Sequence, residues 1–528
     1  MGAMRLPLLQ DYLREQQELT AVERFARRER ASLVRDRVYR EVMPLTPPPE
    51  GHQYAFRVDL DACTGCKACV TACHVQNGLD EDETWRSVGL LRGGTAAAAV
   101  QQTITSSCHH CLDPACMNGC PVGAYEKDAV TGIVKHLDDQ CIGCQYCTFM
   151  CPYEAPKYNA KRGIVRKCDM CSHRIAAGEP PACVEACPTS AIAITIVAKA
   201  QALEEAQNDA FVPGAPSPGI TVPTTTYESK KPLPRNTLPA DFYRVRRSEH
   251  HVPLVVMLVL TQLSVGAFVV DALASRLVPE AVRVRHEPGH VLVAFAIGLV
   301  ALGASVFHLG RPLYAFRAAL GLRTSWMSRE IVAFGLFAPL AMAHAVCSWL
   351  RLDRIHDVLG MLVAIVGALA IACSVFIYDA TKRPFWTASL TAFRFFLTAA
   401  ILGLATGIVT FAAGDARDFV VLLSRLVVMA SITKALGELS IFQHLRDHRQ
   451  HDLKRTAMLL RNDLASWTAA RFVALVLGGI VLPILQVHDP VSLPLSVASW
   501  ILLLLGELCE RTLFFAASSS RGMPGGVA

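Results

Sequence analysis

Residues 63–73 read CTGCKACVTAC, a run that spaces its four cysteines as C-x2-C-x2-C-x3-C. Three closely spaced thiolates on a tight loop can bind three irons of one cubic cluster. The more distant fourth cysteine can serve a neighbouring cube. The run is therefore typical of small α+β domains that fold around iron–sulfur clusters in pairs.

Three more runs of this kind follow, so that sixteen of the nineteen cysteines fall in four sets. One set repeats the first spacing, another opens the middle gap to four residues, and the last opens it to eleven. Four runs predict two cluster pairs. The sets are Cys63, Cys66, Cys69 and Cys73; Cys108, Cys111, Cys116 and Cys120; Cys141, Cys144, Cys147 and Cys151; and Cys168, Cys171, Cys183 and Cys187.

Nested pseudo-twofold symmetry predicts how the sets share ligands, and it gives four [4Fe-4S] clusters because all sixteen positions are Cys. Zinc needs four ligands and has no use for a third cysteine at the next two-residue gap. A disulfide framework suits small secreted domains rather than a membrane protein. In the predicted pairing Cys187 completes the Cys63 cube, Cys73 the Cys168 cube, Cys151 the Cys108 cube, and Cys120 the Cys141 cube.

Length and composition indicate several domains. With 528 residues and 52% hydrophobic residues, the chain is too long for one core and too apolar to be wholly soluble. The net charge of +6 is modest and forms no basic stripe, so we expect no nucleic-acid partner. We predict an α+β bis-ferredoxin-like iron–sulfur domain fused to an all-α eight-helix transmembrane bundle. The expected domains are a polar helical extension (1–50), the four-cluster domain (51–205), a Pro-rich linker (206–251) and the membrane domain (252–528).

The polar N-terminal extension carries a capping box, Thr20 with Glu23, ahead of Phe25. Arg27 and Arg28 resemble a twin-arginine pair, but a polar run follows them where an export signal needs an apolar region. We therefore expect neither a cleavable nor an export signal on this chain.

Eight apolar segments fill the second half, each about long enough to cross a hydrocarbon core of roughly 30 Å. The seventh is the shortest. An even number of spans puts both ends of the bundle on one face of the membrane. The segments are 252–274, 289–309, 330–350, 357–379, 388–413, 418–443, 470–487 and 494–517.

Basic residues are concentrated in the loops on the cluster side, so the positive-inside rule predicts a cytoplasmic iron–sulfur domain on the bacterial inner membrane. Basic residues beneath a docked domain can also serve to hold that domain. An exported partner could also carry the iron–sulfur domain across the membrane, so the opposite orientation stays open. The cluster-side residues include Lys230, Lys231, Arg235, Arg311, Arg317, Arg323, Arg329, Lys382, Arg383, Arg446, Lys454 and Arg455.

His308 at the end of the second span and Glu330 at the start of the third lie at one depth on the cluster side. A quinone headgroup needs hydrogen-bonding partners at its two carbonyls and a route for two protons, which an imidazole and a carboxylate can supply. We predict a quinol site formed by these two residues with Arg311 and Arg329. The alternative is an interfacial histidine beside a snorkelling Glu and Arg.

Other charges inside the spans favour interhelical ion pairs over a proton path. His290 and His344 lie near the opposite face and are weak candidates for haem ligands. Cys347, Cys373 and Cys509 are expected to be small apolar fillers. The charged residues are Arg394, Arg425, Lys434, Glu438, Arg471, Glu507, Glu510 and Arg511.

Two segments of the first half, CHHCLDPAC (108–116) and CPYEAPKYN (151–159), resemble the electron-transfer subunit of dimethyl sulfoxide reductase. Three segments of the second half, HLGRP (308–312), SREI (328–331) and LLGEL (504–508), are similar to the anchor subunit of that enzyme. The chain departs from the family in fusing the two subunits and in adding an N-terminal extension.

The resemblance implies a separate molybdenum bis-pterin catalytic subunit as partner in anaerobic respiration. It also implies menaquinol oxidation in the lipid bilayer, with His308 and Glu330 at the quinol site and no haem. The terminal substrate stays open. Three other functions also stay open: electron flow from a dehydrogenase partner into quinone, a redox-coupled ion pump, and a passive scaffold or redox sensor.

Overall fold

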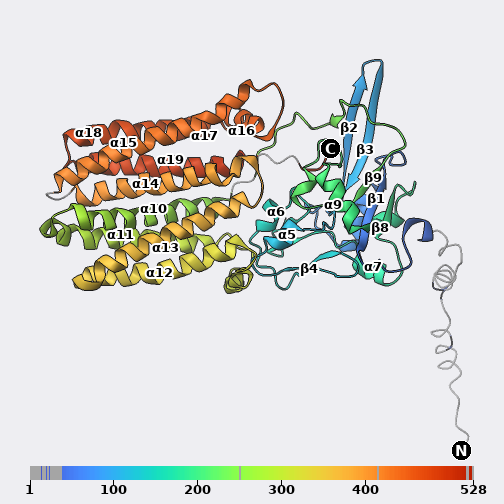
Figure 1. Ribbon diagram of the computed structural model, residues 1–528, viewed down its shortest axis with the longest axis horizontal. Coiled ribbons are helices and arrows are strands. Elements are labelled where there is room, and N and C mark those ends of the chain that lie inside the picture. Colours follow the sequence, from blue (N-terminus) through green and yellow to red (C-terminus); the bar gives the residue numbers. More distant parts are fainter. Residues whose placement is uncertain are drawn as a thin grey trace, which may run out of the picture.

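The computed structural model describes two structural parts joined end to end, a mixed α+β part and a long helical bundle (Figure 1). The C-terminal segment returns from the bundle to the mixed part. The described residues thus form a small α+β domain fused to a bundle of eight long apolar helices. The described residues are 14, 20, 23, 39–248, 251–412, 416–518 and 522–525.

Short strands form four small sheets in the mixed part. The first has the order β8-β1-β9, the second β10-β2-β3, and two hairpins pair β4 with β5 and β6 with β7. The strands are β1 (His52–Asp59), β2 (Ser87–Thr95), β3 (Ala98–Ser106), β4 (Tyr125–Lys127), β5 (Val134–His136), β6 (Lys157–Asn159), β7 (Ile164–Arg166), β8 (Ile192–Ala198), β9 (Thr226–Glu228) and β10 (Leu238–Pro239).

Short helices follow the cysteine loops and contact each other in pairs, α4 with α8 and α5 with α6. This pairing brings the first run to the last and the second to the third. The helices are α4 (Ala68–Asn77), α5 (Ala115–Asn118), α6 (Tyr146–Met150), α7 (Ser172–Ala176), α8 (Ala182–Glu185) and α9 (Lys199–Gln207), with the 3-10 turn η1 (Pro218–Ile220).

Eight helices of the described residues are long and apolar enough to span a membrane. Shorter helical pieces join them on the cluster side: η2 (Pro312–Gly321), η3 (Pro384–Trp386), η4 (Ser440–Arg446) and α16 (Asp452–Arg461). The long helices are α10 (Val252–Leu277), α11 (Glu280–Val306), α12 (Trp326–Leu350), α13 (Asp353–Asp379), α14 (Ala388–Phe411), α15 (Arg417–Leu439), α17 (Ala465–Val476) continued by η5 (Leu477–Val481) and α18 (Leu482–His488), and α19 (Leu493–Ala516).

Two helix starts differ most from the sequence prediction. Helix α11 begins nine residues earlier than expected, because the polar stretch before Gly289 continues the helix and buries Glu287. The seventh span begins at Ala465 and is not short, since it covers 24 residues. Its middle is a π-helical turn just before Pro483. Because proline has no backbone N–H, one helical hydrogen bond is missing there, and the wider turn accommodates the loss.

The Pro-rich linker is integrated into the mixed part. β9 pairs in parallel with β1, and β10 pairs antiparallel with β2. The chain end also lies on this part, because the amide of Leu90 donates to the carbonyl of Gly525 at 3.0 Å. Both ends of the bundle therefore lie on the cluster side, as an even number of spans requires.

Most of the predicted N-terminal helical extension, including Phe25, Arg27 and Arg28, lies outside the described residues. Its capping box is described. The amide of Thr20 donates to Glu23 Oε2 at 2.7 Å, and the amide of Glu23 donates to Thr20 Oγ1 at 3.2 Å. These reciprocal bonds are those of the predicted capping box.

Candidate electron-transfer site

Two cavities in the mixed part are lined by four cysteines each. One has an empty volume of about 360 Å³ and the other of about 300 Å³. In each, three cysteines come from one run and the fourth from a distant run. A cubic cluster with four thiolate ligands fits such a sulfur-lined space. The lining cysteines are Cys108, Cys111, Cys116 and Cys151 in the larger cavity, and Cys63, Cys66, Cys69 and Cys187 in the smaller one.

The remaining eight cysteines lie near one another in the same crossed manner. The thiols of Cys144 and Cys120 interact electrostatically, as do those of Cys73 and Cys183. We number the groups outward from the membrane. Group 1 is Cys141, Cys144, Cys147 and Cys120; group 2 is Cys108, Cys111, Cys116 and Cys151; group 3 is Cys168, Cys171, Cys183 and Cys73; group 4 is Cys63, Cys66, Cys69 and Cys187.

Buried side chains between neighbouring groups establish this order. Tyr125 is near cysteines of groups 1 and 2, Lys167 near cysteines of groups 2 and 3, and Arg86 near cysteines of groups 3 and 4. The four groups therefore form a row in the order 1, 2, 3, 4.

Arg86 and Lys167 are two site residues that the sequence prediction missed. Burial opposes their charge, but the negative charge that the surrounding cysteines carry as thiolates outweighs it and raises the pKa of Arg86 and of Lys167. Arg86 donates to Thr105 and Ser107, and Lys167 donates to the carbonyl of Cys168 at 2.9 Å. Only the position of Lys167 directly before a cysteine could have suggested such a role.

Burial also affects the thiols. It raises the pKa of Cys73 and of Cys144 to about 12, so both are protonated at neutral pH while no metal is bound. Iron must displace these protons when it binds.

Group 1 contacts the loop between α11 and α12 directly. The amide of Arg311 donates to the carbonyl of Ile142 at 3.0 Å, and the amide of Gly321 donates to that of Pro121 at 2.8 Å. A β-carbon at Gly310 would clash with the carbonyl of Gly163. The cysteine loops therefore lie against backbone of the membrane domain.

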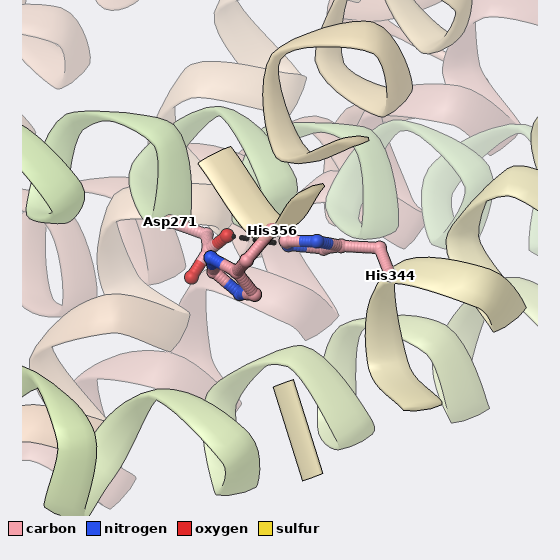
Figure 2. A group of neighbouring side chains, drawn as sticks. All are labelled: Asp271, His344 and His356. Carbon is pink, nitrogen blue, oxygen red and sulfur yellow. Dashed lines mark hydrogen bonds and ion pairs between the residues drawn. The ribbon is translucent and has the colours of Figure 1, made fainter. Parts of the chain in front are cut away.

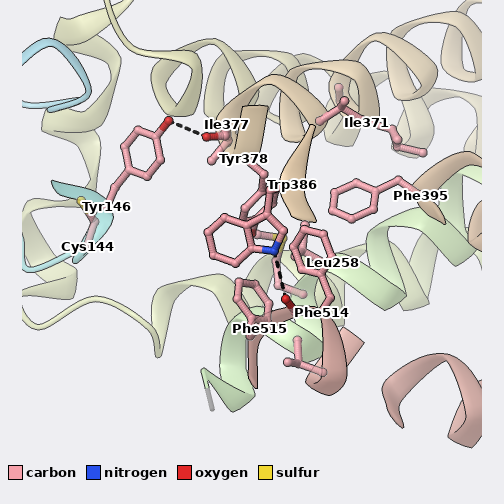
Figure 3. Packing of buried hydrophobic residues seen from close by; sticks show 14 of the residues in the cluster. Cys144, Tyr146, Leu258, Ile371, Ile377, Tyr378, Trp386, Phe395, Phe514 and Phe515 are labelled. Atoms are coloured by element: carbon pink, nitrogen blue, oxygen red, sulfur yellow. Dashed lines mark hydrogen bonds between the residues drawn. The ribbon is translucent and has the colours of Figure 1, made fainter. Parts of the chain in front are cut away.

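Tyr146, which the sequence prediction also missed, extends this contact into the bundle. It lies in the group 1 loop, and its hydroxyl donates to the carbonyl of Ile377 in α13 at 2.7 Å. Figure 3 shows the ring next to Cys144 and, beyond it, the aromatic cluster around Trp386. Burial, followed by the charge of Glu330, raises the pKa of Tyr146.

Glu330 and His308 reach the group 1 loop separately. Glu330 lies in the second turn of α12, is buried, accepts a hydrogen bond from Ser374 of α13, and is near Tyr146. His308 lies two residues beyond the end of α11 rather than in it, because the helix ends at Val306. It bonds to the backbone of Cys144, and burial, with a smaller effect of His251, lowers the pKa of His308 to about 4.

The two arginines of the predicted quinol site make other contacts. Arg311 donates to the carbonyl of Asp138 at 2.9 Å and so holds the iron–sulfur domain. Arg329 donates to the carbonyls of Leu322 and Arg323 and stacks on Trp326.

Most of the charges inside the second half of the bundle form ion pairs, and those of Lys434, Arg471 and Arg394 join different helices, as predicted. Lys434 lies 2.6 Å and Arg471 3.1 Å from carboxylate oxygens of Glu507, and Arg471 also lies 3.0 Å from Glu438. Arg394 and Arg511 both pair with Glu510, at 3.9 and 3.4 Å. Arg425 is exposed on the bundle surface instead.

A cavity of about 380 Å³ is lined by part of this network, including Arg394, Glu438 and Arg471. Glu507 and Arg425, which a connected ion path would also need, are not among the described residues that line it. The arrangement therefore favours paired charges over an ion path.

The two histidines considered as haem ligands each have a protein partner on at least one ring nitrogen. His290 hydrogen-bonds Thr410 Oγ1 and the carbonyl of Ala267, both at 2.8 Å. His344 Nε2 lies 2.8 Å from Asp271 Oδ2.

Comparisons with known proteins match both halves. Residues 246–517, just over half of the sequence, match the family described as the DMSO reductase anchor subunit (DmsC), and residues 100–196 match a 4Fe-4S dicluster domain. The B subunit of anaerobic dimethyl sulfoxide reductase from Haemophilus influenzae is 42% identical over 149 residues, which are 26% of this protein and 72% of the relative. The probable anaerobic dimethyl sulfoxide reductase subunit YnfG from Escherichia coli is 41% identical over 148 residues, with the same coverage. The iron-sulfur subunit of formate dehydrogenase-O from Escherichia coli is 33% identical over 169 residues, covering 28% of this protein and 56% of the relative.

Proposed function

This protein belongs to the DmsC family of dimethyl sulfoxide reductase anchor subunits and carries a 4Fe-4S dicluster domain in the same polypeptide, and from this we propose that it oxidises quinol in the membrane and passes the electrons to a separate molybdenum catalytic subunit. It is a multi-pass membrane protein and a subunit of a dimethyl sulfoxide reductase-like oxidoreductase complex.

The observation that carries the proposal is that both predicted quinol residues lie beside the group 1 loop. His308 bonds to the backbone of Cys144, while Tyr146 lies between Cys144 and α13 and is near Glu330. A quinol bound here would lie next to the innermost cysteine group. The proposed electron path thus begins where the two halves of the protein meet.

The residues of this protein supply binding and proton transfer. Glu330, held by Ser374, can accept a proton from a quinol hydroxyl, and the neutral imidazole of His308 can hydrogen-bond the other oxygen. Four [4Fe-4S] clusters, held by the sixteen cysteines, would supply one-electron carriers in the order of groups 1 to 4.

The opposite end of the row suits a partner. Cys66 of group 4 is exposed and Cys63 and Cys187 are partly exposed, whereas all four cysteines of group 1 are buried. We place the catalytic partner at group 4. The names of the relatives, the B subunit of dimethyl sulfoxide reductase and a formate dehydrogenase subunit, support a molybdoenzyme there.

We also propose a cytoplasmic iron–sulfur domain, because basic residues gather on its side of the bundle. Two of these basic residues also hold the iron–sulfur domain, because Arg311 and Arg317 donate to the backbone carbonyls of Asp138 and Asp139. Proteolysis of intact spheroplasts tests the orientation, since protection of the iron–sulfur domain is expected and cleavage would reverse the assignment.

Glu330→Gln tests the quinol site. The amide keeps the size of the side chain and a partner for Ser374, but it cannot accept the proton. We expect menaquinol to reduce the bound clusters at under a tenth of the normal rate, with an unchanged iron content and cluster spectrum. Anaerobic stopped-flow absorption measures the rate.

Ser374→Ala is the matched control, since it removes the hydrogen bond and keeps the carboxylate; we expect a much smaller loss. Normal quinol turnover in Glu330→Gln would refute the site. Oxidation of pre-reduced clusters by quinone that is much faster than their reduction by quinol would favour the reverse direction of flow.

A further inference from the structure

Three polar side chains converge inside the membrane domain at the end opposite the cysteine groups. Asp271 of α10, His344 of α12 and His356 of α13 are 2%, 0% and 5% exposed. One ligand atom of each lies within 4.8 Å of the others. Figure 2 shows the carboxylate and both imidazoles pointing toward one another from three helices.

Protein contacts leave part of this cluster's hydrogen-bonding capacity unused. Asp271 Oδ2 lies 2.8 Å from His344 Nε2, but Asp271 Oδ1 and His344 Nδ1 have no hydrogen-bond partner among the described residues. Leaving a carboxylate oxygen without a partner is costly in an apolar interior. A bound cation would compensate it.

An outer shell of charges fixes the third ligand and leads to the surface. His356 pairs with the buried Glu287 of α11. Arg283 lies 3.5 Å from Glu287 and 3.1 Å from Asp357, whose side chain is 63% exposed. Asp271 is six residues, or about 9 Å along the helix, from the end of α10. An ion from the aqueous phase on that side therefore has a short polar route to the cluster.

A glycine makes room for the cluster. A β-carbon at Gly360 of α13 would lie 3.0 Å from His344 Cε1 and 3.5 Å from Asp271 Oδ2. The close approach of α13 to both ligands therefore depends on that residue having no side chain.

We propose that Asp271, His344 and His356 form a Zn²⁺ site, with Glu287 orienting His356. Two imidazoles and a carboxylate are zinc ligands, whereas magnesium and calcium prefer oxygen alone. Tetrahedral zinc with bonds of about 2.0 to 2.1 Å separates its ligands by about 3.3 Å. Asp271 Oδ2 and His344 Nε2 need only move apart by a few tenths of an ångström. The ion ties α10, α12 and α13 together and takes no part in electron transfer.

Zinc content and coordination of the purified full-length protein test the site. The protein is treated with a chelator, loaded with ZnCl₂ and dialysed, and zinc and iron are measured in the same sample. We expect one tightly bound zinc per polypeptide, with unchanged iron. Asp271→Asn and His344→Gln should each weaken zinc binding at least tenfold. His290→Gln, which replaces a buried histidine outside the cluster, should keep it.

X-ray absorption at the zinc edge of the wild-type protein needs no variant and distinguishes the ligands. A shell of nitrogen and oxygen at about 2.0 to 2.1 Å with imidazole scattering is expected. A sulfur shell at about 2.3 Å would mean zinc in a cysteine group and would overturn the proposal. Failure to retain zinc, or equal retention by Asp271→Asn, would overturn it as well.

Discussion

The hydroxyl of Tyr146 lies 2.7 Å from the carbonyl oxygen of Ile377, so the loop of the innermost cysteine group is bonded to a membrane helix. Tyr146 lies in the sequence between Cys144 and Cys147, and Ile377 lies one turn from Ser374, the partner of Glu330. One hydrogen bond thus links the proposed quinol residues to the first cluster ligands.

Tyr146→Phe removes this bond and keeps the ring. We expect quinol-dependent cluster reduction to slow several-fold, because a hydrogen bond worth about 1 kcal/mol no longer holds the loop on α13. Iron content and cluster spectra should not change. Tyr158→Phe, in β6 of the same domain, is the control; equal rates in both variants would contradict the role.

Arg86 should set the potential of the two outer groups. Its positive charge among the cysteines of groups 3 and 4 favours the reduced, more negative form of any cluster bound there. Arg86→Gln should therefore lower two potentials by about 50 to 100 mV, the order of a single charge at an effective dielectric constant near 20. A redox titration followed by electron paramagnetic resonance measures the shift.

The control for this variant is Arg57→Gln, which removes a charge from strand β1. It should move the potentials far less. Unchanged potentials in Arg86→Gln, with all the iron retained, would show that the guanidinium does not act on the clusters.

Gly310 tests the contact between the two halves. A β-carbon there would clash with the carbonyl of Gly163, so Gly310→Ala should displace the iron–sulfur domain from the bundle. We expect faster proteolysis of the junction and slower cluster reduction by quinol. Gly303→Ala is the matched control, because a β-carbon at Gly303 of α11 meets no atom within 4 Å. Similar behaviour of the two variants would contradict the proposed contact.

The sequence predicted the features that depend on local spacing. The fold class, the eight apolar helices and the interhelical ion pairs are all present, because cysteine spacing and hydropathy are read along the chain. The capping box at Thr20 could also be predicted from local spacing, because its two residues are three positions apart.

Features that depend on contacts between distant segments could not be predicted in this way. Arg86 and Lys167 look like surface residues in the sequence, and only the crossed cysteine runs bury them. Tyr146 becomes part of the site only when its loop docks on α13. Asp271 and His356 are 85 residues apart, and the return of α13 to α10 brings them together.

Lys434 and Glu507 form a fully buried ion pair, 2.6 Å apart, and removing one partner should cost far more than removing both. Glu507→Gln leaves Lys434 and Arg471 short of negative charge in the membrane interior, and we expect a loss of about 3 kcal/mol in the free energy of unfolding. The double variant Lys434→Met with Glu507→Gln removes both charges and should recover at least half of that loss. Unfolding in mixed micelles measures both values. Lys382→Met serves as the control, since its side chain is 61% exposed and lies 4.0 Å from Asp379, and a surface pair of this kind contributes under about 1 kcal/mol. A double variant no more stable than Glu507→Gln alone would mean that the pair itself does not stabilise the bundle.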